Sequence, residues 1–438
     1  MVLELRNIDK LALSLFDKEA TYDAGPGAWT AGSACSMSGY DGIAQMEDET
    51  VDDKEGVTGT EFPTYQEILK KGWALEYTEN RLKPNTLAGL AALHFGSVTT
   101  VQESGKTAYY HRMQPIYAGT ATKTASTIAF VDSNPDTITD SGSGFVAAGF
   151  KKGMVILVSG SSNNNGIFTI ASVAAGTITL VPDATLTAES AGSSITLTAL
   201  PLPSIGAIYE QAGSQYQAKG IKSNVFTLKL NAGFFALTST LVGSGTRASD
   251  STAFPAKISE SWLKTGKITG LWVETGTNIS IATTPTQGAE NISSATPDDF
   301  TTRLLDFTFT HNNNLRADLG YIAGGGDVRS ELEYGRREAT VEMKIKALQT
   351  AWTTELAYYE NQNTMAVELH CDMGALIDAT GTWNYGFVLI IPQIRLNPVA
   401  RDVQDDFHTI TLSGAVQDDG TNPPVLLYVY NAQSAYII

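Results

Sequence analysis

The chain has few of the residues that mark disulfide-rich, membrane-spanning or nucleic-acid-binding proteins. Among its 438 residues only Cys35 and Cys371 are cysteines, too few for a disulfide framework, and we expect both to be buried thiols. Lysine and arginine number 29 against 46 aspartates and glutamates, a net charge of −17, which excludes tight binding of DNA through its phosphates. The longest apolar run, Phe387–Pro392, is far shorter than the ~20 residues that span a bilayer. The N-terminus has no signal-peptide pattern.

The sequence also lacks the short motifs of common enzyme families. It has no Gly-x-Ser-x-Gly motif, no Walker loop and no His-Glu-x-x-His motif. None of its five histidines pairs with another at metal-ligand spacing. Glu368, His370, Cys371 and Asp372 are close in sequence, but neighbours along a strand point to opposite faces. We therefore expect no enzyme, no metal and no cofactor.

Glycine is abundant, at 40 residues, and threonine, serine and valine are frequent. Low charge combined with frequent turns and β-branched residues is typical of β-rich proteins. Capping signals and apolar stripes predict only three helices among many short strands. The helices are predicted at Thr64–Lys71, from Asn85 or Thr86 onward with Leu87, Leu90 and Leu93 near one face, and at Ala347–Glu360.

Residues 121–200 differ in composition from the rest of the chain. They contain no Trp, Tyr, Cys, His or Arg, and 23 of these 80 residues are Ser or Thr. Short apolar runs alternate with glycine and asparagine turns, and Asn163–Gly166 is a β-hairpin signal. We predict a small all-β domain inserted into a host domain.

The remainder of the chain divides into two similar halves. Each half has a helix and several strands, and each ends on a related strand, Phe234–Leu241 in the first half and Phe407–Gly414 in the second. Such a pattern indicates an internal duplication. We predict a mainly β fold with two tandem domains, each with a flanking helix. The boundaries are an N-terminal arm or loop at 1–62, a discontinuous first domain at 63–120 with 201–250, the inserted domain at 121–200, and a second domain at 251–438.

Several stretches, taken in order, resemble the major tail tube proteins of long-tailed (siphovirus-type) bacteriophages. The clearest is an Asn-Asn-Leu-Arg block followed by Gly-Tyr and then by a Gly-Arg-Arg entry into a strand. The resemblance covers about residues 64–438, and the arm at 1–62 lies outside it. The stretches are His311–Tyr321, Gly335–Met343, Leu93–Thr100 with Tyr109 and His111, and Lys219–Leu228; the inserted Phe150–Gly166 is similar to small β modules of phage virion proteins.

The resemblance implies a fold and a function together. Each tube domain would be a β-sandwich that lines a channel with four strands, so three two-domain chains would close about 24 strands into a ring. Rings would stack head to tail into the tube of a long flexible tail. An acidic, hydroxyl-lined channel would repel phosphate and let DNA pass during genome ejection.

The resemblance also implies partners and a location. The chain would be a structural virion protein, made in the host cytoplasm and located in the phage tail, with no membrane insertion. Its partners would be its own copies, a tape-measure protein, and the distal tail and tail-terminator proteins, with DNA passing only transiently. The duplication favours homotrimeric, pseudo-hexameric rings, and a homohexamer is the alternative.

Alternation of polar and apolar residues predicts which side chains face the channel. The aspartates of a hairpin loop are predicted at the channel or at the seam between rings, with an ordinary solvated turn as the alternative. The apolar C-terminus is predicted to dock on a neighbouring subunit, with folding onto its own domain as the alternative. The residues are Thr238, Thr240, Thr409, Thr411 and Ser413 for the channel, Asp402, Asp405 and Asp406 for the loop, and Tyr436, Ile437 and Ile438 for the tail.

Two other functions compete with this interpretation. A carbohydrate-binding or adhesin-like surface protein would need clustered exposed aromatics or a calcium loop, and the inserted domain has only four Phe and no Trp or Tyr. A polysaccharide hydrolase would need a pair of carboxylates, and no pair stands out. In the tail tube interpretation the inserted domain lies on the outer surface of the tube.

Overall fold

The computed structural model describes most of the chain, and within that part it is built almost entirely from antiparallel strands. The predicted mainly β fold is confirmed, and a single α-helix is present among the described residues. These residues are 8–25, 27, 29, 34–37, 40–46, 49–52, 66–117, 119–211, 213–275, 280–282, 285–293, 298–322, 326–347, 364–397, 400–404 and 407–437.

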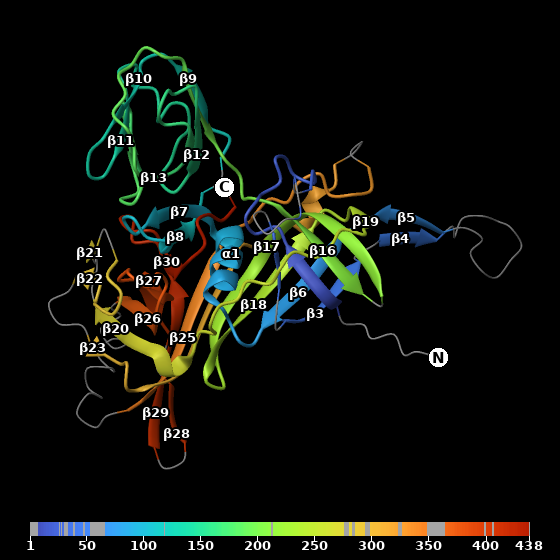
Figure 1. Ribbon diagram of the computed structural model, residues 1–438, viewed down its shortest axis with the longest axis vertical. Coiled ribbons are helices and arrows are strands. Elements are labelled where there is room, and N and C mark those ends of the chain that lie inside the picture. Colours follow the sequence, from blue (N-terminus) through green and yellow to red (C-terminus); the bar gives the residue numbers. More distant parts are fainter. Residues whose placement is uncertain are drawn as a thin grey trace, which may run out of the picture.

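The centre of the molecule is an eight-stranded antiparallel run within a larger 19-stranded sheet. We call this run the central sheet (Figure 1). Its strands, in spatial order, are β3 (Tyr40–Met46), β6 (Trp73–Glu79), β18 (Phe234–Gly243), β17 (Ser214–Asn231), β24 (Leu304–Asn312), β25 (Glu338–Lys346), β29 (Phe407–Val416) and β28 (Ala400–Gln404).

The two halves of the chain contribute four strands each, in the same arrangement. In chain order the first half supplies β3, β6, β17 and β18, and the second half supplies β24, β25, β28 and β29. In both halves the spatial order is first, second, fourth, third. The third strand of the first half, β17, then pairs with the first strand of the second half, β24. The duplicated sequence pattern therefore has a counterpart in a duplicated strand order.

A second layer of strands packs against the apolar side of the central sheet. Phe235 on β18 meets Phe387 on this layer, with ring centroids 5.0 Å apart and nearly perpendicular rings. Both belong to one continuous core that draws residues from both halves. We call the part of the molecule built around this core the body, and its two layers make it sandwich-like. The layer consists of β20 (Ile268–Thr275), β26 (Thr364–Leu376), β27 (Asn384–Leu396), β30 (Leu426–Asn431), β8 (Tyr109–Pro115) and β7 (Gly96–Gln102), with the short β23 (Asp298–Asp299) on β20.

The predicted helix near Asn85 is present as α1 (Pro84–Phe95) and is buried along its whole length. Proline occupies the first turn, where its missing N–H costs nothing, and Gly96 ends the helix with a left-handed φ of 79°. Neither Asn85 nor Thr86 caps it. Instead the Asn85 N–H donates to a carboxylate oxygen of Glu260, 2.9 Å away, from a distant part of the chain.

The N-terminal residues expected as an arm take part in the body. β1 (Ile8–Leu13) pairs with β16 (Ile205–Gln211), and β3 is an edge strand of the central sheet. The short strand β2 (Cys35–Ser36) pairs with β1, and β19 (Arg247–Ser249) pairs with β17. The other small elements are β21 (Ser280–Ile281), β22 (Ile292–Ser293), η1 (Thr265–Lys267) and η2 (Ala317–Gly320).

The helix predicted at Thr64–Lys71 is wrong. Residues Gln66–Lys70 form strand β5, which pairs with β4 (Glu49–Asp52) in a projecting two-stranded ribbon (Figure 1). So short a helix is marginal by itself, and pairing with a second strand satisfies the same backbone groups. Of the helix predicted at Ala347–Glu360, only Ala347 lies within the described residues, in extended backbone that donates to the His408 carbonyl.

Strands from residues 122–199 form a separate unit with its own seven-stranded sheet and its own apolar core. It stands at one end of the molecule, opposite the β28–β29 hairpin (Figure 1). We call it the module. Its strands are β9 (Thr122–Ala125), β10 (Ile128–Val131), β11 (Thr137–Asp140), β12 (Val155–Ser159), β13 (Gly166–Ala174), β14 (Thr177–Leu180) and β15 (Ile195–Ala199).

Candidate functional surface

One face of the central sheet is polar, and a row of threonines runs directly across five of its strands. The pairing register places Thr78 opposite Thr238, Thr238 opposite Thr227, Thr227 opposite Thr310, and Thr310 opposite Thr340. The hydroxyl oxygens of Thr78 and Thr238 are 3.2 Å apart, and those of Thr227 and Thr310 are 3.1 Å apart. We call this polar side the threonine face. It joins strands of both halves into one surface.

The threonine face exists because side chains alternate along each strand. On β24, Phe307 and Phe309 are buried in the core between the two layers, and Thr308 and Thr310 are half-buried on the other side. The same period of two holds on β25, where Val341 and Met343 are buried and Glu342 is exposed. The alternation in the sequence therefore determines which side of each strand is apolar and which is polar, whatever its neighbouring strands are.

The charges on the threonine face are mixed rather than basic. Among the described side chains of its strands, acidic and basic residues occur in similar numbers. Asp306 lies opposite Lys344, so opposite charges are paired across β24 and β25. The acidic residues are Glu76, Asp306, Glu338 and Glu342, and the basic residues are Lys229, Lys344 and Lys346. Such a surface has no excess of cations to hold phosphates.

The residues predicted to line a channel fall at three kinds of position. Thr238 and Thr240 lie half-buried on β18, and Thr411 and Ser413 lie half-buried on β29, on the threonine face. Thr409 shares their register but is only 1% exposed, at the edge of an open groove beside the turn between β17 and β18. Asp402 lies on β28, whose side chains are outside the description, and Asp405 and Asp406 lie outside the described residues.

The C-terminal tail folds onto its own chain, which was the alternative to docking on a neighbour. Tyr436 is fully buried, with its ring 4.7 Å from that of His111 and its hydroxyl donating to the Asn85 side chain. The Ile437 N–H donates to the Leu15 carbonyl, 3.2 Å away. Tyr436 therefore has no surface left for a second subunit, because its own chain already fills that contact. Ile438 lies outside the described residues.

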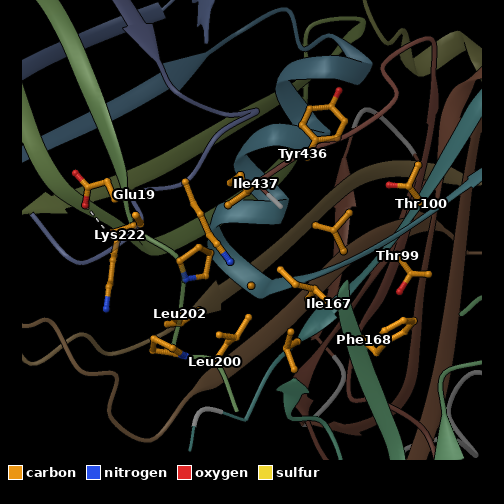
Figure 2. Close-up of a pocket in the computed structure, with 18 of the residues that line it drawn as sticks. Glu19, Thr99, Thr100, Ile167, Phe168, Leu200, Leu202, Lys222, Tyr436 and Ile437 are labelled. Carbon is orange, nitrogen blue, oxygen red and sulfur yellow. Dashed lines mark hydrogen bonds between the residues drawn. The ribbon is translucent and has the colours of Figure 1, made fainter. Parts of the chain in front are cut away.

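Tyr436 and Ile437 also line a cavity of about 340 Å³ where the body meets the module (Figure 2). Ile167 and Phe168 of the module lie across the cavity from them. Two of its polar residues are engaged: Glu19 accepts from the Ser204 hydroxyl at 2.6 Å, and Lys222 pairs with Glu331, whereas the Tyr22 hydroxyl oxygen is buried without a hydrogen-bond partner in the described part of the chain. The cavity is thus a space of mixed polar and apolar lining between the body and the module.

Two histidines of the resembling stretches form a buried polar cluster where the halves join. His94 Nε2 is 2.7 Å from His311 Nδ1, and His94 Nδ1 is 2.9 Å from the Ser223 hydroxyl. The Asn313 amide donates to the backbone carbonyls of His94 and Ser223, both at 2.9 Å. Burial holds the pKa of His94 well below its usual value and lowers the pKa of His311 to about 3, so both rings are neutral. Sequence spacing gave no sign of this pair, because it joins elements far apart in the chain.

Glu368 and His370 do come together, although adjacency in sequence was no reason to expect a site. They are two residues apart on β26, so they share a face, and their Oε1 and Nε2 atoms are 2.5 Å apart. The Gly288 N–H donates to His370 Nδ1 at 3.3 Å, and the Asn291 side chain donates to Glu368 at 2.7 Å. At 0% and 1% exposure neither side chain can meet a substrate, so the pair anchors the loop around Asn291.

Two other carboxyls, one fully buried and one half-buried, have raised pKa values. Glu79 is 0% exposed and accepts from the Tyr77 hydroxyl at 2.7 Å, and burial raises its pKa to about 7. Glu260 has its pKa raised to about 7 by the same cause. Within the described residues, no group of three His, Cys, Asp or Glu side chains is arranged to hold a metal ion. None of the described helices has the length and apolar content needed to cross a membrane.

The chain matches no protein-family model and no curated protein.

Proposed function

We propose that this chain is the subunit of a hollow tube, the major tail tube protein of a long-tailed bacteriophage, that conducts DNA and performs no catalysis. The observation that carries the proposal is the duplicated strand order of the central sheet together with its two open edges. Among the described residues, β3 pairs only with β6, and β28 pairs only with β29. An open edge of unpaired N–H and C=O groups is a ready template for another strand.

The duplication supplies the geometry for closing a ring. Within the chain, the third strand of one repeat (β17) pairs antiparallel with the first strand of the next (β24). By the same rule, β28, the third strand of the second repeat, would pair with β3, the first strand of the first repeat, in the next copy. Three chains with eight strands each then place 24 strands around one bore, and no edge remains unpaired.

The threonine face would line that bore. Hydroxyls and a balanced set of charges offer water-like contacts without a lasting hold on phosphate, and the net charge of −17 repels DNA over a longer range. The module lies outside the central sheet and would sit on the outer wall of the tube. Association with a tape-measure protein and with the distal tail and tail-terminator proteins, and assembly in the host cytoplasm into a virion tail, are part of the same proposal.

The test is assembly of the purified chain. Electron microscopy should show rings or stacked tubes with a central bore, and the mass of one ring should equal three chains. Six chains would favour the homohexamer instead. Particles that stay monomeric at every concentration and bind glycans would contradict the proposal and favour a carbohydrate-binding surface protein.

A single substitution at the open edge sharpens the test. Gln404 and Phe407 form the last residue pair of the β28–β29 hairpin, so the N–H of Val403 should point away from β29, toward the open edge. Val403→Pro removes that donor and should abolish rings while monomers keep a wild-type circular dichroism spectrum. Val403→Thr keeps the N–H and should assemble normally. Normal rings from Val403→Pro would rule out this seam.

A further inference from the structure

A second, smaller cavity at the junction of the body and the module has an unusual set of polar groups. Its volume is about 180 Å³, and the body contributes strand β8 and the residues around Pro423. The module contributes Lys152 and Gly153, Ile170 and Ala171, and Val181 and Pro182. We call it the junction cavity. It is distinct from the threonine face and from the larger cavity of Figure 2.

Arg112 and Gln114 reach this cavity from the same face of β8. They are 6% and 3% exposed. Within the described part of the chain, the Nε and Nη1 atoms of Arg112 and the Oε1 atom of Gln114 are buried without a hydrogen-bond partner. A buried polar group that lacks a partner destabilises the fold, so side chains of this kind are normally hydrogen-bonded to protein, water or a ligand.

Asp183 satisfies the arginine only in part. Its Oδ2 atom is 3.6 Å from Arg112 Nε, too long for a hydrogen bond, while its Oδ1 atom accepts from the Tyr110 hydroxyl at 2.8 Å. Burial raises the pKa of Asp183 even though Arg112 opposes that shift. The Nε and Nη1 donors of Arg112 thus remain without a hydrogen-bond partner, although Tyr428, another lining residue, also contacts the guanidinium.

The module adds a second cation to the lining. Lys152 Nζ donates one hydrogen bond, to the Asn422 carbonyl at 3.3 Å, which leaves two of its three protons for other acceptors. The carboxylate among the lining residues, Asp418, is exposed and accepts from the Tyr117 hydroxyl at 3.0 Å. An arginine fork and a lysine thus face a shared space across the junction.

We propose that the junction cavity binds hydrogen phosphate. The unpartnered arginine donors and the lysine call for an anion with several acceptor oxygens, and an arginine fork suits a tetrahedral oxyanion. The unpartnered Gln114 oxygen calls for a donor, which the P–OH group of hydrogen phosphate supplies and the fully ionised sulfate does not. The cavity is large enough, since a water molecule takes up about 30 Å³ in the liquid.

Phosphate in this position would clamp the module to the body, because its ligands come from both. It would act independently of ring closure, which depends on β3 and β28. The two proposals can therefore fail separately: rings without phosphate binding, or phosphate binding by a chain that stays monomeric.

Thermal unfolding of the full chain tests the site. Sodium phosphate at pH 7 should raise the unfolding temperature by several degrees in a saturable way, and sodium sulfate at the same ionic strength should raise it less. Broadening of the phosphorus NMR line of inorganic phosphate by the protein should give the same affinity. Equal effects of the two salts, or no broadening, would mean that water fills the cavity and would overturn the proposal.

Matched variants locate the binding. Lys152→Met should weaken phosphate binding at least tenfold, while Lys151→Met, which changes the exposed neighbouring lysine outside the lining, should leave it unchanged. Arg112→Gln should abolish it. Because Arg112→Gln also removes the partner of buried Asp183 and can unfold the chain, Lys152→Met is the deciding variant. Wild-type phosphate affinity in Lys152→Met would overturn the proposal.

Discussion

Buried ionisable side chains dominate the chemistry of this molecule at the scale of single residues. His111 makes contacts typical of a neutral imidazole: its Nδ1 is 2.9 Å from the Thr100 hydroxyl and its Nε2 is 3.1 Å from the Asn431 side-chain oxygen. Burial lowers its pKa to about 4. The same cause acts on His94 and His311, whereas the buried carboxyls Glu79 and Glu260 have raised pKa values and respond to pH in the opposite sense.

The His111→Gln variant should lose part of the acid sensitivity of the fold. Unfolded histidine takes up a proton near pH 6.5 and folded His111 only near pH 4, so its contribution is complete above pH 6.5 and is lost as the pH falls toward 4. At pH 5 the loss is about 2 kcal/mol. Urea unfolding between pH 8 and 5 gives the slope of the unfolding free energy against pH for wild type and variant. The difference between the two slopes isolates His111, because the opposing carboxyl contribution is the same in both proteins.

His408→Gln is the matched control, because His408 is exposed, and it should leave the slope unchanged. Identical pH slopes for wild type and His111→Gln would show that His111 takes up its proton as readily in the folded chain as in the unfolded one.

At the scale of strands, the alternation of polar and apolar side chains determines the two faces of each sheet. Close backbone contacts limit which residues fit between neighbouring strands. Gly386 on β27 lies opposite Asp372 and Tyr430, in the middle of the second layer. A Cβ atom there would lie 2.0 Å from the Cys371 carbonyl oxygen, a backbone atom that cannot move aside alone. Glycine is thus required at this position by a neighbouring strand.

The Gly386→Ala variant should be destabilised by at least about 1–3 kcal/mol, the usual cost of overpacking a core. Gly266→Ala is the control, because no atom lies within 4 Å of a Cβ at that position. Thermal or urea unfolding of both variants measures the effect. Equal stabilities would mean that β26 and β27 can separate without cost.

At the scale of the whole molecule, the body and the module are two packed units with little shared core. Their apolar contact is a small cluster around Ile116, Val155 and Leu202, supported by a 2.7 Å hydrogen bond between the hydroxyls of Ser97 and Thr169. Each has its own large apolar core. Such an arrangement favours independent folding of the two units.

Replacement of residues 120–202 by a short Gly-Ser linker should therefore leave a folded body that still forms rings, because the central sheet lies wholly outside the deleted part. The fragment 119–203 should unfold cooperatively when expressed alone. Calorimetry and electron microscopy measure these outcomes. A body that collapses without the module would show that the small junction cluster is essential to the larger core.

The features that depend on local order along the chain could be predicted from the amino-acid sequence. The change in composition near residues 121 and 200 coincides with the ends of the separate sheet, and the alternation Phe307, Thr308, Phe309, Thr310 sorted one strand into an apolar and a polar face. The resemblance of Phe234–Leu241 to Phe407–Gly414 anticipated that β18 and β29 hold the same place in their halves. These patterns are readable because side-chain direction follows from position along a strand.

Which segments of the chain meet became clear from the folded molecule alone. A strand at Gln66–Lys70 replaced a predicted helix because a partner strand was available, and Tyr436 turned inward because Asn85 and His111 lined a place for it. The His94–His311 pair and the partnerless Arg112 donors likewise arise between elements distant in the chain. Pairing energies depend on contacts across the whole fold, and no local pattern encodes which of many compatible strands or pockets will be the neighbour.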